Sequence, residues 1–179
     1  MDYLDSIVSL SDRIEPKWTS DRELKYLAEL AQTSKHFIEI GSWYGRSAKV
    51  ISHSLPENGI LYCVDIFWEG SEKIFRENMK EEISSGKVKV FVGSSDEASP
   101  RVREALKGEL VDVIWIDDGH LYKDVERDIN YYRDFLKPGG LLIGHDYYID
   151  TDVARAVQNI LPGFNIVEGT TIWRWKDTR

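Results

Sequence analysis

Residues 37–47 read Phe-Ile-Glu-Ile-Gly-Ser-Trp-Tyr-Gly-Arg-Ser, an apolar strand that carries Glu39 and runs through a glycine turn into a helix. Asp65 follows at the end of the next apolar run. Glycines at positions 41 and 45 let the backbone come close to a ligand that a side chain would block. Two acids beside such a turn can hold a ribose and a charged cofactor. This segment therefore predicts a strand, a turn and a helix with a ligand above them.

Strand and helix patterns alternate along the chain. Apolar runs predict strands at residues 37–40, 60–66, 87–92, 111–116, 141–144, 165–167 and 171–175. Helices are predicted at residues 19–32, 46–54, 71–84, 100–106, 123–136 and 152–161. The first of these helices carries a capping box, formed by Ser20 and Glu23. Because alternating strands and helices give right-handed crossovers, we expect a parallel α/β sheet covered by helices on both faces.

Length and charge narrow the function classes. The 179 residues fit a single domain with a full core, in which residues 1–34 form a helical segment that could serve as a lid. The net charge is −8 and no basic block stands out, so we expect no nucleic-acid partner. No apolar run approaches the ~18 residues of a membrane span, so we expect no membrane partner. Cys63 is the only cysteine, which suits a reducing, cytoplasmic setting.

The glycine turn does not match the common nucleotide fingerprints. It is Gly-x-x-x-Gly, and Trp43 stands where the dinucleotide motif needs its middle glycine. A phosphate-binding loop would need a Gly-Lys-Ser or Gly-Lys-Thr ending, and here Arg46 follows Gly45. Glu39 would repel a phosphate but suits a ligand with a positive centre or an amino group. These differences argue against a nicotinamide-dependent reductase.

Polar residues after the fourth and fifth strands predict the chemistry. In parallel sheets, ligands bind at the carboxyl ends of the strands. Asp117, Asp118 and His120 follow the fourth strand, while His145 and Asp146 follow the fifth. A histidine is the natural acceptor for a hydroxyl proton near neutral pH. Carboxylates with a histidine make a plausible set of ligands for a divalent metal, and acids that only hydrogen bond are an equal alternative.

Four segments, residues 39–47, 64–65, 116–122 and 136–147, resemble class I S-adenosylmethionine-dependent methyltransferases. The likeness is greatest to the small-molecule group related to macrolide and sugar O-methyltransferases. It implies a Rossmann-like seven-stranded sheet, mostly parallel with a reversed last strand and with helices on both faces. It covers about residues 35–148 and extends weakly to the end of the chain.

The resemblance also implies roles for individual residues. It places the glycine turn around the methionine part of the cofactor, Asp65 on the ribose hydroxyls, and the serines after the third strand near the adenine. The implied cofactor site is Glu39, Gly41, Ser42, Gly45, Ser47, Asp65, Ile66, Ser94, Ser95 and Asp117. The implied catalytic residues are Asp117, His120 and His145, and the implied Mg²⁺ or Mn²⁺ ligands are Asp117, His145 and Asp146. His145 departs from the family, whose members usually carry an acid there.

We therefore expect methyl transfer from S-adenosylmethionine to a hydroxyl of a small-molecule acceptor, with or without a divalent metal. A catalytically inactive cofactor-binding or accessory protein on the same fold is the alternative. Because relatives often pair, a homodimer is one expected state.

Overall fold

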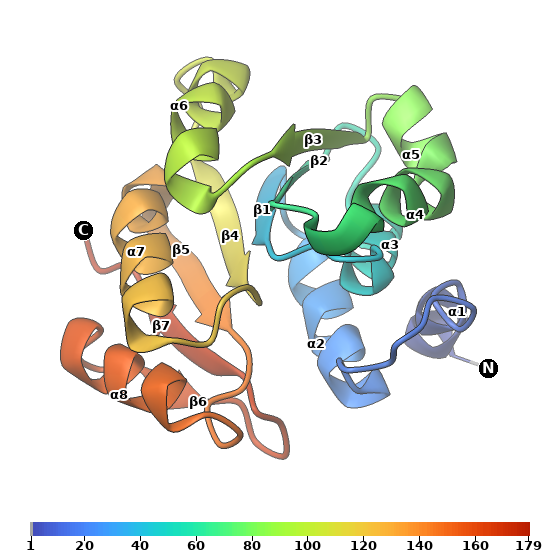
Figure 1. Cartoon of the computed structure of the whole chain (residues 1–179). Coiled ribbons are helices and arrows are strands. Elements are labelled where there is room, and N and C mark those ends of the chain that lie inside the picture. Colours follow the sequence, from blue (N-terminus) through green and yellow to red (C-terminus); the bar gives the residue numbers. More distant parts are fainter. Residues whose placement is uncertain (1) are drawn as a thin grey trace.

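A seven-stranded sheet runs through the computed structural model, which describes residues 2–179 (Figure 1). The strands are β1 (His36–Ile40), β2 (Ile60–Asp65), β3 (Val88–Val92), β4 (Val111–Ile116), β5 (Leu136–Gly144), β6 (Asn165–Ile166) and β7 (Trp173–Lys176). Their order in the sheet is β3-β2-β1-β4-β5-β7-β6. The first five strands are parallel, and β7 runs antiparallel to both β5 and β6. This confirms the predicted α/β sheet with a reversed last strand.

Helices cover both faces of the sheet. They are α1 (Tyr3–Ser9), α2 (Asp21–Ala31), α3 (Arg46–Ser54), α4 (Ser71–Asn78), α5 (Lys80–Ser84), α6 (Ser95–Leu106), α7 (Tyr122–Tyr132) and α8 (Thr151–Ile160), with short 3₁₀ turns η1 (Trp68–Gly70) and η2 (Arg133–Phe135). Figure 1 shows α6, α7 and α8 on one side of the sheet and α2, α3, α4 and α5 on the other. No helix among residues 2–179 has the length and apolar character that crossing a membrane requires.

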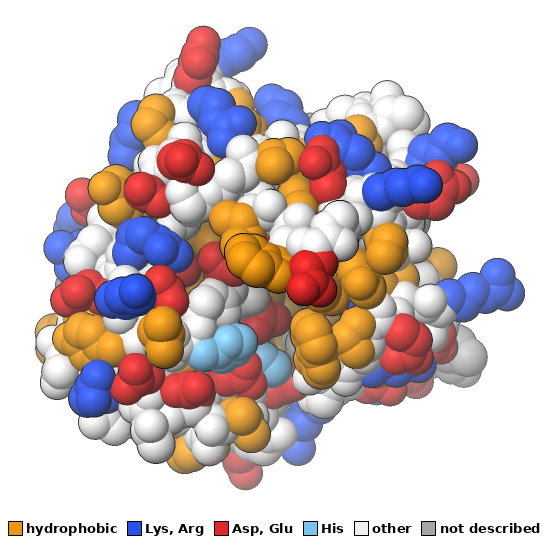
Figure 2. All heavy atoms as spheres, in the orientation of Figure 1, with side chains coloured by type: hydrophobic (Ala, Val, Ile, Leu, Met, Phe, Trp, Pro, Cys, Tyr) orange, Lys and Arg blue, Asp and Glu red, His pale blue; other side chains and the backbone are white. Residues whose placement is uncertain are grey.

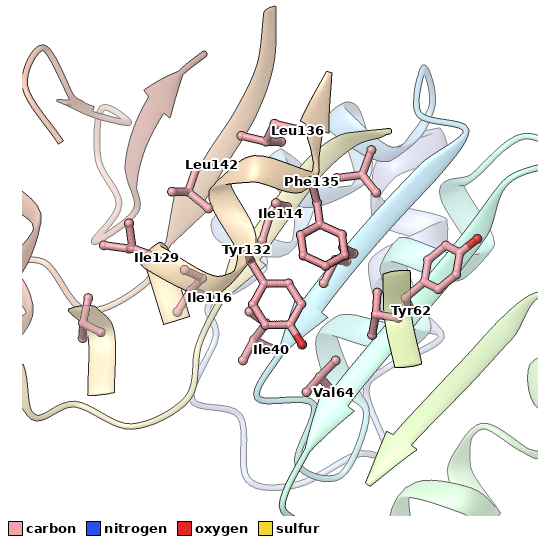
Figure 3. Packing of buried hydrophobic residues seen from close by; sticks show 14 of the residues in the cluster. Ile40, Tyr62, Val64, Ile114, Ile116, Ile129, Tyr132, Phe135, Leu136 and Leu142 are labelled. Atoms are coloured by element: carbon pink, nitrogen blue, oxygen red, sulfur yellow. The ribbon is translucent and has the colours of Figure 1, made fainter. Parts of the chain in front are cut away.

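The core divides into two layers because successive side chains of a strand point to opposite faces. In β1, Ile38 and Ile40 pack with the α6–α8 layer, whereas Phe37 packs with the α2–α4 layer. Figure 3 shows Ile40 near Tyr132 of α7 in the first layer. Since β1 is buried along its whole length, its one acid, Glu39, lies inside the protein.

Several helix and strand boundaries differ from the sequence predictions. The predicted capping box at Ser20 and Glu23 is present and begins α2. A second capping box, Ser94 with Glu97, begins α6 at Ser95, five residues before the predicted start at Pro100. The helix predicted at residues 71–84 is divided at Met79, whose backbone is not helical. Helix α1 lies in the N-terminal segment that was predicted to be helical, although its bounds were not predicted. Strand β5 begins at Leu136, earlier than expected.

Candidate active site

The carboxyl ends of β1, β2, β4 and β5 surround a cavity of about 580 Å³. The loops after these strands and the segment between α1 and α2 form its wall. Its lining is Ile14, Pro16, Trp18, Thr19, Gly41, Ser42, Trp43, Tyr44, Arg46, Ser47, Asp65, Ile66, Trp68, Asp117, Asp118, His120, His145, Asp146 and Ile149. Figure 2 shows histidine and acidic side chains in the hollow, between groups of hydrophobic side chains. The sheet therefore places its polar rim in one concave site.

The glycine turn is packed against the end of β4. Gly41 has φ +89°, and a Cβ built on it would lie 2.1 Å from the carbonyl oxygen of Asp117. Gly45 also has φ +89° and begins α3, where a Cβ would meet the side chains of Met79 and Phe75 at 3.0–3.1 Å. Both conformations favour glycine. The turn can therefore bring its backbone close to a ligand, while Gly45 itself faces the core and not the cavity.

Glu39 lies beneath the turn and does not line the cavity. The Ser42 hydroxyl donates a 2.6 Å hydrogen bond to its Oε2 atom, and its Oε1 atom is buried without a partner. Burial raises the pKa of Glu39 to about 7, although hydrogen bonds from Ser42 and Ser47 oppose the shift. Glu39 thus supports the turn from below, whereas the sequence prediction put it against the cofactor.

Asp65 accepts two backbone hydrogen bonds at the cavity wall. The amide of Trp43 donates to Oδ2 at 2.7 Å, and the amide of Phe67 donates to Oδ1 at 2.5 Å. Burial raises the pKa of Asp65, although these amides oppose the shift. Each carboxylate oxygen keeps a further lone pair for a ligand. Asp65 therefore joins the β1 turn to the β2 loop and can still bind a donor from the cavity.

Most, but not all, of the predicted site residues meet at this cavity. Those that line it are Gly41, Ser42, Ser47, Asp65, Ile66, Asp117, His120, His145 and Asp146. Ser94 and Ser95 do not line it. Ser94 caps α6, and the buried Ser95 hydroxyl donates to Asp128 on α7. The geometry gives no support to a contact between these serines and an adenine, because the start of α6 uses them.

His145 is enclosed by three carboxylates. Its Nδ1 atom lies 3.3 Å from Oδ1 of Asp117 and 3.2 Å from Oδ1 of Asp146, while Nε2 lies 3.2 Å from Oε2 of Glu23. The Glu23 contact is an ion pair without hydrogen-bond geometry. Burial alone would lower the pKa of His145, but the three carboxylates outweigh it and raise the pKa to about 12. The three carboxylates therefore favour the cationic form of His145, in which neither ring nitrogen can accept a proton.

His120 is the more accessible histidine, with 51% of its side chain exposed. Its Nε2 atom lies 2.7 Å from Oδ2 of Asp146. This hydrogen bond raises the pKa of His120 above 6.5, against a smaller opposing effect of burial. Burial would raise the pKa of Asp146, but hydrogen bonds from His120 and His145 hold it well below its usual value. The pair can thus accept and hold a proton at the cavity.

A metal ion would have different ligands from those predicted. Ligand atoms of Asp117, His120 and Asp146 lie within 4.8 Å of one another, so His120 takes the place that the sequence prediction gave to His145. Mg²⁺ and Mn²⁺ prefer oxygen ligands, and one of these three atoms is an imidazole nitrogen. The cationic ring of His145 also faces both carboxylates. The three residues therefore fit Mg²⁺ or Mn²⁺ poorly.

The segment between α1 and α2 adds residues that the sequence did not single out. Arg46 is buried and donates to the backbone oxygens of Ser11 and Thr19 and to the carboxylate of Asp21. It thereby anchors the segment to the start of α3. Trp18, from this segment, has its ring centroid 5.8 Å from that of Trp43. Arg46 and Trp43 lie in the glycine-turn segment, residues 37–47, but nothing in the sequence indicates which residues their side chains contact.

A family model described as a methyltransferase domain matches residues 38–147, more than half of the chain. The chain belongs to this methyltransferase family. The matched segment runs from β1 through the loop after β5, and so contains the rim residues of all four strands that border the cavity. A search of curated protein sequences gives no significant match.

Solved structures share the fold of this methyltransferase at low sequence identity. The Bacillus cereus O-methyltransferase in complex with SAH (S-adenosylhomocysteine) is 17% identical, with a TM-score of 0.72, over 97% of this chain and 90% of that one. The O-methyltransferase TomG of Streptomyces achromogenes, which acts in tomaymycin synthesis and was solved with SAM (S-adenosylmethionine), is 16% identical. Its TM-score is 0.71, over 99% of this chain and 91% of that one. SAH-bound PaMTH1 of Podospora anserina is 14% identical, with a TM-score of 0.72, over 99% and 89%.

Proposed function

We propose that this methyltransferase transfers a methyl group from S-adenosylmethionine to a hydroxyl group of a small-molecule acceptor. One observation carries the proposal: Asp65, the Gly41 turn and the His120–Asp146 pair face the same cavity. Donor-binding groups and a proton acceptor then share one cavity. An in-line displacement needs this arrangement, because the reacting atoms must be held close and aligned.

The cavity fits the adenosyl sulfonium donor. Asp65 has free acceptor capacity for ribose hydroxyls, and Gly41 lets the turn approach the methionine part without a side chain in the way. Ser42, Ser47 and Ile66 line the same wall, and Glu39 supports it from beneath. When bound, the donor supplies a methyl group made electrophilic by the sulfonium. The structures of the Bacillus cereus enzyme with SAH and of TomG with SAM support this assignment.

His120 takes the acceptor's proton in this proposal. Asp146 fixes the ring through Nε2, which leaves Nδ1 free to act as the general base. Asp146 also stabilises the imidazolium that forms. Asp117, which lines the cavity between the two histidines, orients the acceptor hydroxyl. His145 is a positioning residue, since it contacts Asp117 and Asp146, is buried, and is already protonated beside three carboxylates.

No metal ion takes part in the proposed reaction, because the three candidate ligands fit Mg²⁺ and Mn²⁺ poorly. The segment between α1 and α2 forms part of the cavity wall, and in this proposal residues 1–34 act as its cover. The homodimer and the lack of nucleic-acid and membrane partners stay predictions.

Two measurements test the proposal. Calorimetric titration with SAH is expected to give saturable binding. Incubation with S-adenosylmethionine and a panel of hydroxylated acceptors is expected to yield SAH. No heat and no thermal shift at millimolar SAH would remove the proposed donor site. Binding without turnover on the whole panel would favour the alternative, a cofactor-binding or accessory protein. Binding of a reduced nicotinamide in place of SAH would favour a reductase.

A further inference from the structure

Carboxylates dominate the charge of the cavity. Asp65, Asp117, Asp118 and Asp146 line it. Among the described residues that line it, Arg46 is the single Lys or Arg, and His145 is already paired with carboxylates on three sides. The bound donor would add one net positive charge and would leave the carboxylates in excess. A second ligand in the cavity therefore meets a negative field.

Arg46 cannot serve an anionic ligand. Its Nη1 atom donates to the backbone oxygen of Ser11 at 2.9 Å, and Nη2 donates to Oδ1 of Asp21 at 3.0 Å. Its Nε atom is 3.4 Å from the backbone oxygen of Thr19, and only 6% of the residue is exposed. A phosphate or carboxylate on the acceptor would thus lie among carboxylates without a free cation to pair with, which is unfavourable. Acceptors that carry a phosphate group, including those linked to a nucleotide through a thioester, are therefore disfavoured.

Two exposed tryptophans line the same cavity as these carboxylates. Trp18 is 69% exposed and Trp68 is 64% exposed, and both line the cavity. Trp18 lies against Trp43, which in turn stacks on Tyr44 with ring centroids 4.9 Å apart. The face of an indole ring attracts a cation and also packs against a flat ring. Exposed indole rings and carboxylates that line one cavity are suited to a small organic cation.

We infer that the methyl acceptor is a hydroxylated small molecule that carries a protonated amine. Its hydroxyl lies at His120, and its ammonium group lies against the tryptophan faces in the field of the carboxylates. The inference rests on the proposed function, because it concerns the acceptor side of the same cavity. It adds the charge class of the substrate.

Three phenols of similar size and different charge test the inference. Tyramine is cationic, 4-ethylphenol is neutral and 4-hydroxyphenylacetate is anionic at pH 7. Their affinities are measured by tryptophan fluorescence and calorimetry, with the protein saturated with SAH. Tyramine is expected to bind at least tenfold more tightly than 4-ethylphenol, and 4-hydroxyphenylacetate is expected to bind weakest. The advantage of tyramine should shrink as salt is added, because salt screens exposed charges.

A pair of variants tests the contribution of the indole face. Trp18→Ala is expected to weaken tyramine binding about fivefold, the size of an exposed cation–π contact, while Trp18→Phe keeps part of the affinity. The control is Tyr131→Ala on α7, since Tyr131 is 47% exposed and does not line the cavity. This control should leave the affinity for tyramine unchanged.

The outcomes separate the inference from the proposed function. If SAH binds but 4-ethylphenol or 4-hydroxyphenylacetate binds as tightly as tyramine, the inference is overturned and the methyltransferase proposal stands. The same holds if tyramine does not bind at all. If SAH itself does not bind, the proposed function fails first and the inference fails with it.

Discussion

The carbonyl oxygen of Asp117 occupies the place where a side chain on Gly41 would begin. The oxygen lies 2.1 Å from the ideal Cβ position, and Gly41 has φ +89°. The turn and the end of β4 meet through backbone atoms. Neither segment can therefore move aside without disturbing the sheet. The cavity floor therefore depends on the absence of a side chain at this position.

Gly41→Ala is predicted to destabilise the protein by about 3 kcal/mol, the sum of left-handed strain and overpacking. SAH binding should be lost with it. Urea unfolding and calorimetry measure the two effects. Gly163→Ala is the control, because Gly163 also has positive φ but has no atom within 4 Å of its Cβ position. The control should lose only about 1 kcal/mol, and equal losses in the two variants would contradict the steric explanation.

Asp65→Asn is predicted to weaken SAH binding by about tenfold or more, because a charged acceptor contributes about 1.5–3 kcal/mol to its hydrogen bonds. The amide nitrogen would also face the backbone N–H of Trp43 or Phe67, which now donate to the two carboxylate oxygens. Calorimetric titration gives the affinity. Asp134→Asn, at an exposed acid of η2, is the control and should bind SAH as the natural chain does. An unchanged affinity in Asp65→Asn would mean that the ribose lies elsewhere.

Local sequence patterns predict the fold and part of the site. Gly41 and Asp65 stand directly after apolar strands, so the parallel sheet alone brings them to one edge. Strand alternation predicts the parallel sheet, whereas the reversed last strand was expected only from the resemblance to methyltransferases. Ser95 shows the limit of this reasoning. Its position after a strand suggested a ligand contact, but the capping box of α6 turns its hydroxyl toward Asp128.

Contacts between distant segments could not be predicted. Glu23 reads as a capping residue, yet it also reaches His145 and Thr171, which are more than 120 residues away in the chain. Both His120 and His145 line the cavity, and the contact with Glu23 adds a third carboxylate beside His145 only. The contact depends on how α2 packs against the sheet, and a single sequence does not reveal that packing.

Glu23→Gln is predicted to lower the free energy of unfolding by about 3 kcal/mol near pH 6, because it leaves the buried cation of His145 with one carboxylate fewer. The Glu23 carboxylate also accepts from Ser20 and from the backbone amide and hydroxyl of Thr171. Urea unfolding measures the loss. Glu29→Gln, on the exposed face of the same helix, is the control and should change stability by less than about 0.5 kcal/mol.

The effect of Glu23→Gln should depend on pH. Burial would raise the pKa of Glu23, but the ion pair with His145 and the hydrogen bonds from Thr171 and Ser20 outweigh this and lower the pKa below 4.5. A carboxyl whose pKa is lowered by folding stabilises the protein above its unfolded pKa, and that stability is lost as the pH falls through the folded pKa. The difference between natural chain and variant should therefore shrink below pH 4.5. A difference that stays constant down to pH 3 would contradict the ionic role of Glu23.

Removal of divalent metals is predicted to leave methyl transfer unchanged. The ligand atoms of Asp117, His120 and Asp146 include an imidazole nitrogen, and the His145 cation already faces both carboxylates. Initial rates are compared after dialysis against EDTA and after addition of Mg²⁺ or Mn²⁺. A rate that is lost with EDTA and restored by Mg²⁺ would instead assign these carboxylates to a metal.

His120→Ala is predicted to lower kcat about 100-fold or more, the usual contribution of a positioned general base, while SAH still binds. His53→Ala is the control, since His53 pairs with Glu82 outside the cavity. In the natural chain kcat should fall as the pH decreases, because the hydrogen bond to Asp146 raises the pKa of His120 above 6.5 and only the neutral ring accepts a proton. Asp146→Asn should move this inflection to lower pH, toward 6.5, because an amide stabilises the imidazolium less. An inflection that does not move in Asp146→Asn, or a kcat that survives in His120→Ala, would assign the proton to another group.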